Sequence, residues 1–382
     1  MVYLNNAATT FPKPQSVTEA MTAALTTVPL SQFRSSFSSD GSEDVIMRCR
    51  RNIGRLLNIA DFQKIYFTSG ATESLNILIR GLSDRCRCIV STAIEHNSVN
   101  RPLAAFYPDK DITIIGCDGY GRIDIDELEK CLRTRSDNSG DDGISLLIVN
   151  HCSNVTGCIQ DIASITNIAH RYNFLVLIDL SQSAGCIPVD FDGWDIDMIA
   201  FTGHKSLFGP QGTGGYYFKS SLDIKPLMYG GTGRDSSRIA YNGDYEYEVG
   251  TMNETGIAGL NAGVEYLLSR GVKNVFEDNR KKVKYLYNAL SLFGDKITIY
   301  GSYESCQGPV MSFNIRGMKP SDVGYILEKS YGIIVRTGLQ CAPLIHKYLQ
   351  SPDGTVRVSV SDMTEYDDLD VFISAMKDIT NF

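Results

Sequence analysis

The sequence lacks the marks of a membrane or secreted protein. Its 382 residues contain no apolar run long enough to span a bilayer, and its first residues, Met-Val-Tyr-Leu-Asn-Asn, have neither the basic nor the apolar stretch of a signal peptide. It also lacks a Lys/Arg-rich segment, and its formal net charge is −8, which argues against a general nucleic-acid binder. We therefore expect a cytoplasmic protein with no membrane or nucleic-acid partner.

Cysteine is present, but its spacing gives no framework. Ten cysteines are scattered along the chain, no CxxC occurs, and Cys86 and Cys88 form only a CxC. A disulfide scaffold or a zinc site would need closely spaced pairs. We expect reduced thiols that mostly pack in the interior, and no metal site.

What the chain does contain is a repeated alternation of strand and helix. Hydrophobic residues make up 43% and charged residues 21%, as in a packed globular protein. Helical patterns separate several apolar strands, for example at 124–132 and 161–172, which predicts an α/β fold with a mainly parallel sheet covered by helices on both faces. The seven strand candidates are 65–68, 88–92, 112–115, 146–150, 175–179, 198–201 and 215–218.

The pattern changes near residue 250. Long amphipathic helices at 257–267 and 275–292 are followed by shorter strands and two further helices, at 321–329 and 366–379. This predicts a smaller α+β domain. We divide the chain into a large α/β domain, residues 13–254, and a small domain formed by residues 1–12 and 255–382. The strand candidates of the small domain are 297–300, 310–315, 333–336 and 355–360.

One lysine stands in an unusual place. An apolar segment ends in Thr202-Gly203-His204-Lys205, and a glycine-rich loop follows. A lysine held at the end of a buried strand can lose its proton and attack a carbonyl carbon. We therefore interpret Lys205 as the residue that holds an aldehyde cofactor as a Schiff base.

Other polar residues follow neighbouring strand ends, where an open α/β sheet binds ligands. Asp179 closes the run 175–179 and could hold a proton on a pyridine nitrogen, while Gln182 reaches the phenolic oxygen of the ring. His96 could stack on a planar cofactor or act as an acid or base. The competing interpretations are metal binding by Asp179, which has no second ligand at a suitable spacing, and a structural role for His96.

A group of small residues predicts an anion site. Ser69-Gly70-Ala71-Thr72 joins a strand to a helix, so the N–H groups around Ala71 and the hydroxyl of Thr72 could hold a phosphate. Taken alone, the segment is more typical of an ordinary helix start. It is not a P-loop, because no Gly-Lys-Ser/Thr follows at the required spacing.

Four further residues are candidates for the site, and three of them have an ordinary alternative. Asn154 could bind a carboxylate or the ring oxygen, or be a turn residue. Arg357 offers a fork for a carboxylate, or a surface ion pair. Cys341 lies among glycine and proline, where a thiol is reachable, and Thr251 could cap a helix or meet an anion.

Together these residues describe one cofactor. They supply a lysine for an aldehyde, an acid for a ring nitrogen, an imidazole for a ring face and an anion site for a phosphate. Pyridoxal 5′-phosphate has these four features.

The chain resembles the cysteine desulfurases of the class V aminotransferase group, within the fold-type I pyridoxal-phosphate enzymes. The resemblance covers nearly the whole length, and 15 residues between Cys341 and Arg357 make it similar to the short-loop, group II branch. The motifs that carry it are Tyr3-Leu-Asn-Asn-Ala-Ala-Thr-Thr, Phe67-Thr-Ser-Gly-Ala-Thr-Glu, Glu95-His-Asn-Ser, His151-Cys-Ser-Asn-Val-Thr-Gly, Asp179-Leu-Ser-Gln-Ser-Ala-Gly, Phe201-Thr-Gly-His-Lys, Glu248-Val-Gly-Thr-Met-Asn, Arg336-Thr-Gly-Leu-Gln-Cys-Ala-Pro and Val356-Arg-Val-Ser.

The resemblance implies conversion of L-cysteine to L-alanine, with the sulfur taken as a persulfide by Cys341. It also implies a homodimer, a sulfur-acceptor protein and a place in sulfur metabolism such as iron–sulfur cluster assembly. By this resemblance Asn154 and Arg357 bind the substrate carboxylate and Thr251 reaches in from a second subunit. The cofactor residues it implies are Lys205, Asp179, Gln182 and His96 at the ring, with Ala71, Thr72, Thr202 and His204 at the phosphate.

Some alternatives remain open from the sequence. Gln340 stands where the family often has a histidine, and Asn5 where an aspartate is common. A cysteine or cystine C–S lyase or a selenocysteine lyase shares Lys205 and Asp179 but needs no nucleophilic loop cysteine. A non-catalytic scaffold protein is a third interpretation.

Overall fold

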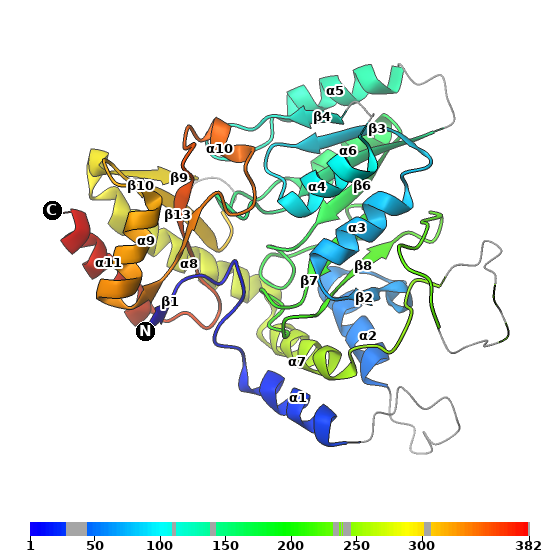
Figure 1. The fold of residues 1–382 in the computed structure, drawn as a ribbon, viewed down its shortest axis with the longest axis horizontal. Helices are drawn as coiled ribbons and strands as arrows, with labels where there is room; N and C mark the ends of the chain where they lie inside the picture. Colours follow the sequence, from blue (N-terminus) through cyan, green and yellow to red (C-terminus); the bar gives the residue numbers. More distant parts are fainter. Residues whose placement is uncertain are drawn as a thin grey trace.

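A computed structural model shows a seven-stranded sheet, a four-stranded sheet and a two-stranded pair, with helices packed on them (Figure 1). The structure describes residues 1–27, 44–108, 112–137, 143–231, 237, 239, 246–301 and 307–380. The larger sheet has seven strands in the order β2-β8-β7-β6-β5-β3-β4. Their bounds are β2 Tyr66–Thr68, β3 Cys86–Thr92, β4 Ile112–Ile115, β5 Ile144–Asn150, β6 Phe174–Asp179, β7 Met198–Thr202 and β8 Gly214–Phe218.

The direction of the strands confirms the predicted α/β class. The five strands from β4 to β7 pair in parallel, whereas β8 runs antiparallel to β7 and β2 antiparallel to β8. Parallel strands bring their carboxyl ends to one edge of the sheet, so the residues that follow β5, β6 and β7 lie near one another.

Helices cover both faces of this sheet, because neighbouring residues of a strand point to opposite sides. On β5, for example, Leu146 packs in one core cluster and Leu147 in the other. One face is covered by α3 (Ala71–Gly81) and α4 (Asn97–Phe106). The other is covered by α2 (Val45–Leu57), α5 (Ile125–Asp137), α6 (Ile162–Arg171) and α7 (Glu254–Arg270), and α1 (Gln15–Thr26) packs on α7.

The smaller sheet is antiparallel, with strand order β12-β13-β10-β9. Its strands are β9 Ile297–Tyr300, β10 Val310–Ile315, β12 Arg336–Gly338 and β13 Thr355–Ser359, and a short parallel pair joins β1 (Val2–Tyr3) to β11 (Ile333–Ile334). Its helices are α8 Val272–Ser291, α9 Pro320–Tyr331 and α11 Tyr366–Thr380, whereas Ile345 of the short α10, Ile345–Tyr348, packs in the core of the large sheet. Both chain ends lie beside this sheet in Figure 1, so the first residues join the C-terminal part of the chain.

One predicted strand is wrong in detail. The segment 333–336 is divided between β11, which pairs with β1, and β12, which pairs with β13. Val335 separates two short pairings that belong to different sheets, and an apolar run alone does not show such a break. Within the described ranges, no helix is long and apolar enough to cross a membrane.

Candidate active site

A cavity of about 420 Å³ opens at the carboxyl ends of the parallel strands. Eleven of the twelve residues predicted for the site line it, although they come from segments up to 286 positions apart, Ala71 to Arg357. These residues are Ala71, Thr72, His96, Asn154, Asp179, Gln182, Thr202, His204, Lys205, Cys341 and Arg357.

Lys205 lies in the turn that follows β7. Its backbone carbonyl accepts a hydrogen bond from the hydroxyl of Thr10 at 2.9 Å. Burial of the amine lowers the pKa of Lys205 to about 8, and nearby Arg357 acts in the same direction, while Asp179 and Cys341 oppose the shift. An amine with this pKa is partly neutral near neutral pH and can act as a nucleophile.

Asp179 is buried at the end of β6, where the sheet delivers it to the cavity. The N–H of Ser181 donates to its Oδ1 at 2.8 Å, and the Ser181 hydroxyl bonds to the same oxygen. Gln182 is fixed by a 3.0 Å bond from its Nε2 to the carbonyl of Ala7. A carboxylate held this way can face a protonated ring nitrogen.

His96 begins α4 and caps it with its own ring. The N–H of Ser98 donates to Nδ1 of His96 at 3.0 Å, and the Ser98 hydroxyl lies 2.8 Å from that of Thr72. Burial, together with the charge of Lys205, lowers the pKa of His96 to about 4. The ring is therefore neutral near pH 7, and with Nδ1 accepting, its proton sits on Nε2.

The first turn of α3 is suited to an anion. No side chain caps its first residues, so N–H groups at the start of the helix are available to a ligand. β8 passes close to this turn, because a Cβ on Gly214 would lie 2.5 Å from Cα of Gly70. Thr202 and His204 line the cavity from the end of β7.

Arg357 enters the cavity from β13 and is buried. Its two terminal nitrogens donate to the carbonyl of Asn154 at 2.9 Å and to Oδ1 of Asn5 at 3.2 Å. Burial lowers the pKa of Arg357 to about 10, and Arg336 adds to this effect. The Asn154 amide donates to the carbonyl of Gln340 at 2.7 Å, and its buried Oδ1 has no partner among the described residues.

Cys341 is the exposed thiol among the nine cysteines that the structure describes. It follows β12, in a turn, and it lies near enough to Lys205 to affect the lysine's pKa. The other eight cysteines in this part of the chain are buried or half-buried, as expected for packing residues. No group of three His, Cys, Asp or Glu side chains there is arranged to hold a metal ion.

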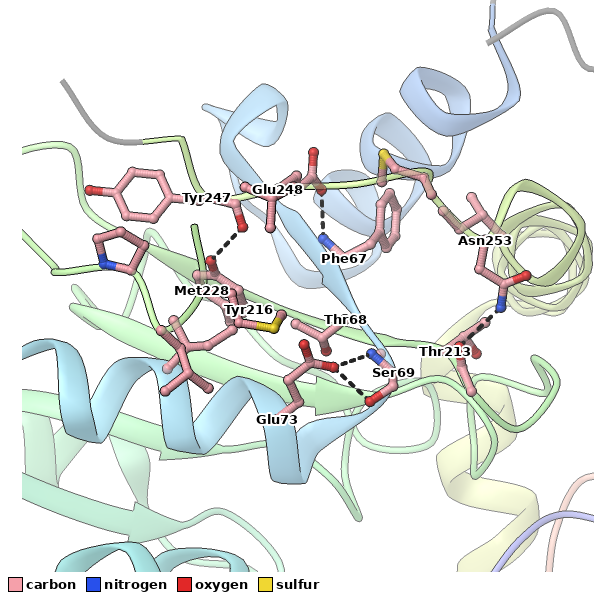
Figure 2. Close-up of a pocket in the computed structure, with 18 of the residues that line it drawn as sticks. Phe67, Thr68, Ser69, Glu73, Thr213, Tyr216, Met228, Tyr247, Glu248 and Asn253 are labelled. Atoms are coloured by element: carbon pink, nitrogen blue, oxygen red, sulfur yellow. Dashed lines mark hydrogen bonds between the residues drawn. The ribbon is translucent and has the colours of Figure 1, made fainter. Parts of the chain in front are cut away.

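Thr251 does not line the Lys205 cavity of its own chain. It lies in a neighbouring hollow of about 230 Å³, which shares Ser69 and Glu73 with that cavity (Figure 2). The loop before Thr251 is fastened by Glu248, which accepts the N–H of Phe67 at 2.7 Å and pairs with Arg50 at 2.6 Å. The placement leaves Thr251 exposed, close to the first turn of α3.

Among the residues at or beside the site that had no predicted role are Arg336 and Glu95. Arg336 also lines the cavity, and it is paired with Arg357 on the neighbouring strands β12 and β13. Glu95 is fully buried, and its Oε1 accepts the Thr92 hydroxyl at 2.6 Å and the Asn150 N–H at 2.8 Å. Burial raises the pKa of Glu95 to about 8. Both stand inside motifs of the sequence, but the pairing of β12 with β13 places Arg336, and the bonds to Thr92 and Asn150 place Glu95.

Comparison with known proteins agrees with this geometry. The family described as "Aminotransferase class-V" matches residues 2–372. A "Probable cysteine desulfurase" of Methanothermobacter thermautotrophicus is 33% identical over 94% of this chain and 90% of the relative, and "Cysteine desulfurase CsdA" of Escherichia coli is 29% identical over 98% and 93%.

Solved structures match over nearly the whole chain as well. The apo structure of a cysteine desulfurase from Thermococcus onnurineus superposes with a TM-score of 0.85 at 27% identity, covering 100% of this chain and 94% of that one. The structure of Escherichia coli CsdA gives a TM-score of 0.84 at 26% identity, covering 98% and 94%. The chain belongs to the class-V aminotransferase family.

Proposed function

We propose that this protein is a pyridoxal-phosphate-dependent cysteine desulfurase, which converts L-cysteine to L-alanine and takes the sulfur on Cys341. The observation that carries the proposal is that Lys205, with its pKa lowered to about 8, and the exposed thiol of Cys341 open into the same cavity. The relatives that bear the name cysteine desulfurase, matched over nearly their full length, support it.

The cavity fits pyridoxal 5′-phosphate, the cofactor that the family implies. Lys205 would hold the aldehyde, Asp179 the ring nitrogen, Gln182 the phenolic oxygen and His96 the ring face. The uncapped start of α3, with Ala71 and Thr72, would hold the phosphate together with Thr202 and His204. When bound, this cofactor withdraws electrons from the bonds at the substrate's α-carbon.

The residues of the chain supply the remaining steps. Arg357 binds the substrate carboxylate, and it is preset for this by its bonds to Asn154 and Asn5. Asn154 lies beside this carboxylate site. Lys205, when neutral, accepts the proton from the α-carbon.

Cys341 then completes the transfer. Its thiolate attacks the substrate sulfur, so that an S–S bond forms as the substrate's carbon–sulfur bond breaks. The electron pair of the broken bond stays with the substrate's β-carbon, which takes up a proton, Lys205 returns its proton to the α-carbon, and alanine leaves. The sulfur is oxidised to the persulfide level and the carbon is reduced, so L-cysteine and the enzyme thiol give L-alanine and the enzyme persulfide. The exposure of Cys341 supports onward transfer to a thiol-bearing acceptor protein.

Product analysis tests the proposal. Purified protein loaded with the cofactor is incubated with L-cysteine and a reductant, and alanine, sulfide, pyruvate and ammonia are measured together. Equal amounts of alanine and sulfide are expected. Pyruvate with ammonia would mean a C–S lyase, and a protein that binds no cofactor at all would be a scaffold.

The same proposal includes a homodimer. Thr251 lies outside its own chain's cavity, on an open surface that adjoins the anion site at Ser69 and Glu73. A second subunit facing this surface would bring its Thr251 to the phosphate of the first.

A further inference from the structure

The turn that carries Cys341 has an unfavourable backbone. Gln340 and Cys341 have φ angles of 45° and 58°, and the N–H of Ala342 donates to the carbonyl of Leu339 at 2.9 Å. Two central residues with positive φ are typical of a type I′ turn, whose usual residues are Asn and Gly. Glutamine and cysteine both have a Cβ, so this turn needs support from its surroundings.

The surroundings bond to each carbonyl of the turn. Nε2 of His346 lies 3.3 Å from the carbonyl of Leu339. The Asn154 amide donates to the carbonyl of Gln340 at 2.7 Å, and the backbone N–H of Asn97 donates to that of Cys341 at 2.7 Å. Asn97 and Asn154 both follow strands of the large sheet. Their hydrogen bonds therefore connect the turn, which follows β12 of the small sheet, to the large sheet.

The side chain of Gln340 adds the remaining support. It is buried, with 5% of its surface exposed, although its neighbour Cys341 is exposed. Its Nε2 donates to the carbonyl of Thr355 at 2.8 Å, and its Oε1 accepts from the Thr355 hydroxyl at 3.3 Å. Thr355 lies on β13 two residues before Arg357, so Gln340 links the thiol to the strand that presents the arginine.

We propose that Gln340 is a positioning residue for Cys341. Gln340 lies at the cavity wall, but both polar atoms of its side chain are bonded to Thr355; these bonds hold the left-handed turn, and so fix the thiol relative to Arg357 and Lys205. The inference rests on the proposed function, because it assumes that Cys341 reacts with sulfur bound at Arg357. Small displacements of a reacting group lower the rate of its step more than the binding of substrate.

The test compares two variants with a matched control. Gln340→Ala removes both side-chain bonds, and Gln340→Gly removes them while also relieving the left-handed backbone. The control is Gln350→Ala, since Gln350 is an exposed glutamine with a φ of 53° on the same segment. Steady-state alanine formation is measured on protein with wild-type cofactor absorbance, so that folding defects are separated from defects in the reaction.

For both Gln340 variants we expect kcat for alanine formation to fall about 10-fold, with KM for L-cysteine within about twofold of wild type. The control should keep both constants. In cofactor-free protein, amide hydrogen exchange at Ala342 should be about 10-fold faster in Gln340→Ala and unchanged in Gln350→Ala.

The results separate the positioning role of Gln340 from the proposed function. If Gln340→Gly keeps the wild-type kcat, or if kcat and KM change together, the positioning role is wrong while alanine formation by the wild type still upholds the proposed function. If the wild-type protein forms no alanine, the proposed function itself fails. If Gln340→Ala does not fold, Gln340→Gly and its hydrogen exchange give the result.

Discussion

At the scale of single residues, the site is set by burial. The same desolvation lowers the pKa of Lys205 to about 8 and of His96 to about 4, and raises that of Glu95 to about 8. In each case burial disfavours the charged form. The cavity therefore holds a partly neutral amine, a neutral imidazole and, beside them, a neutral carboxylic acid at neutral pH.

The pKa of Lys205 predicts how cofactor loading depends on pH. Only the neutral amine attacks an aldehyde, so the loading rate of cofactor-free protein should rise with pH and level off above about 8, rather than near 10.5. Absorbance of the bound cofactor, followed by stopped flow, measures this. Nα-acetyl-lysine in solution, whose side-chain amine is free, serves as the control. A rate for the protein that still rises beyond pH 10 would contradict the assignment.

Glu95 predicts a pH-dependent stability. The folded chain keeps this proton up to about pH 8, whereas an unfolded glutamic acid loses it near 4.5, so stability falls as pH rises through that window. Glu95→Gln replaces the acid with a side chain of similar shape that is neutral at every pH. Its free energy of unfolding should equal that of wild type near pH 5 and exceed it by about 2 kcal/mol or more at pH 8, as measured by denaturant titration. A constant difference across pH would mean that Glu95 is charged in the folded protein.

At the scale of elements, the alternating strands and the first residues of most helices are predicted well from the sequence, because their apolar periodicity is strong. The residues after strand ends were therefore found, and Ala71, Asp179 and Lys205 share one cavity as expected. Helices α2 and α4 were not predicted. α4 contains Pro102 and is capped by the ring of His96, so its sequence has no ordinary start signal, whereas α2 has one in Asp44, which accepts the N–H of Ile46.

The approach of β8 to α3 gives a prediction for the anion site. A methyl group at Gly214 would lie 2.5 Å from Gly70 and 2.8 Å from the carbonyl of Phe201, so Gly214→Ala must push β8 away from the first turn of α3. We expect a loss of about 1–3 kcal/mol in stability and an affinity for the cofactor weakened about 10-fold. Thermal unfolding and fluorescence titration measure these changes.

Gly119→Ala is the matched control for this substitution, because a Cβ there would meet nothing within 4 Å. It should leave both quantities unchanged. If Gly214→Ala binds the cofactor as wild type does, the phosphate is held somewhere other than this turn.

At the scale of the whole molecule, the site joins parts that sequence reasoning could pair only through the resemblance. The small sheet brings Arg357 and Cys341 to residues of the large sheet, and the pairing of β1 with β11 ties the first residues to that unit. The contact of Asn154 with Gln340, and the pairing of Arg336 with Arg357, depend on how the sheets meet. No local pattern in the sequence predicts such contacts.

A mixed dimer tests the shared site. Lys205→Ala and Thr251→Asp are each expected to be inactive, the second because a carboxylate would repel the phosphate. If Thr251 acts across the interface, a mixed dimer has one site with both residues intact, so equal amounts of the two variants, dissociated and reassembled together, should recover roughly a quarter of wild-type alanine formation. No recovery would mean that Thr251 serves its own chain, and full activity of Thr251→Asp by itself would mean that it serves no site.

The central step of the proposed reaction is the transfer of sulfur to Cys341. The direct measurement is mass spectrometry of the peptide that carries Cys341, after cofactor-loaded protein has reacted with L-cysteine in the absence of reductant. We predict a mass increase of one sulfur atom on Cys341, removed by a thiol reductant, and in Cys341→Ala an alanine yield lowered at least about 1,000-fold with normal cofactor absorbance. Two results would contradict this role: wild-type protein that forms alanine while Cys341 stays unmodified, or Cys341→Ala protein that forms alanine at the wild-type rate.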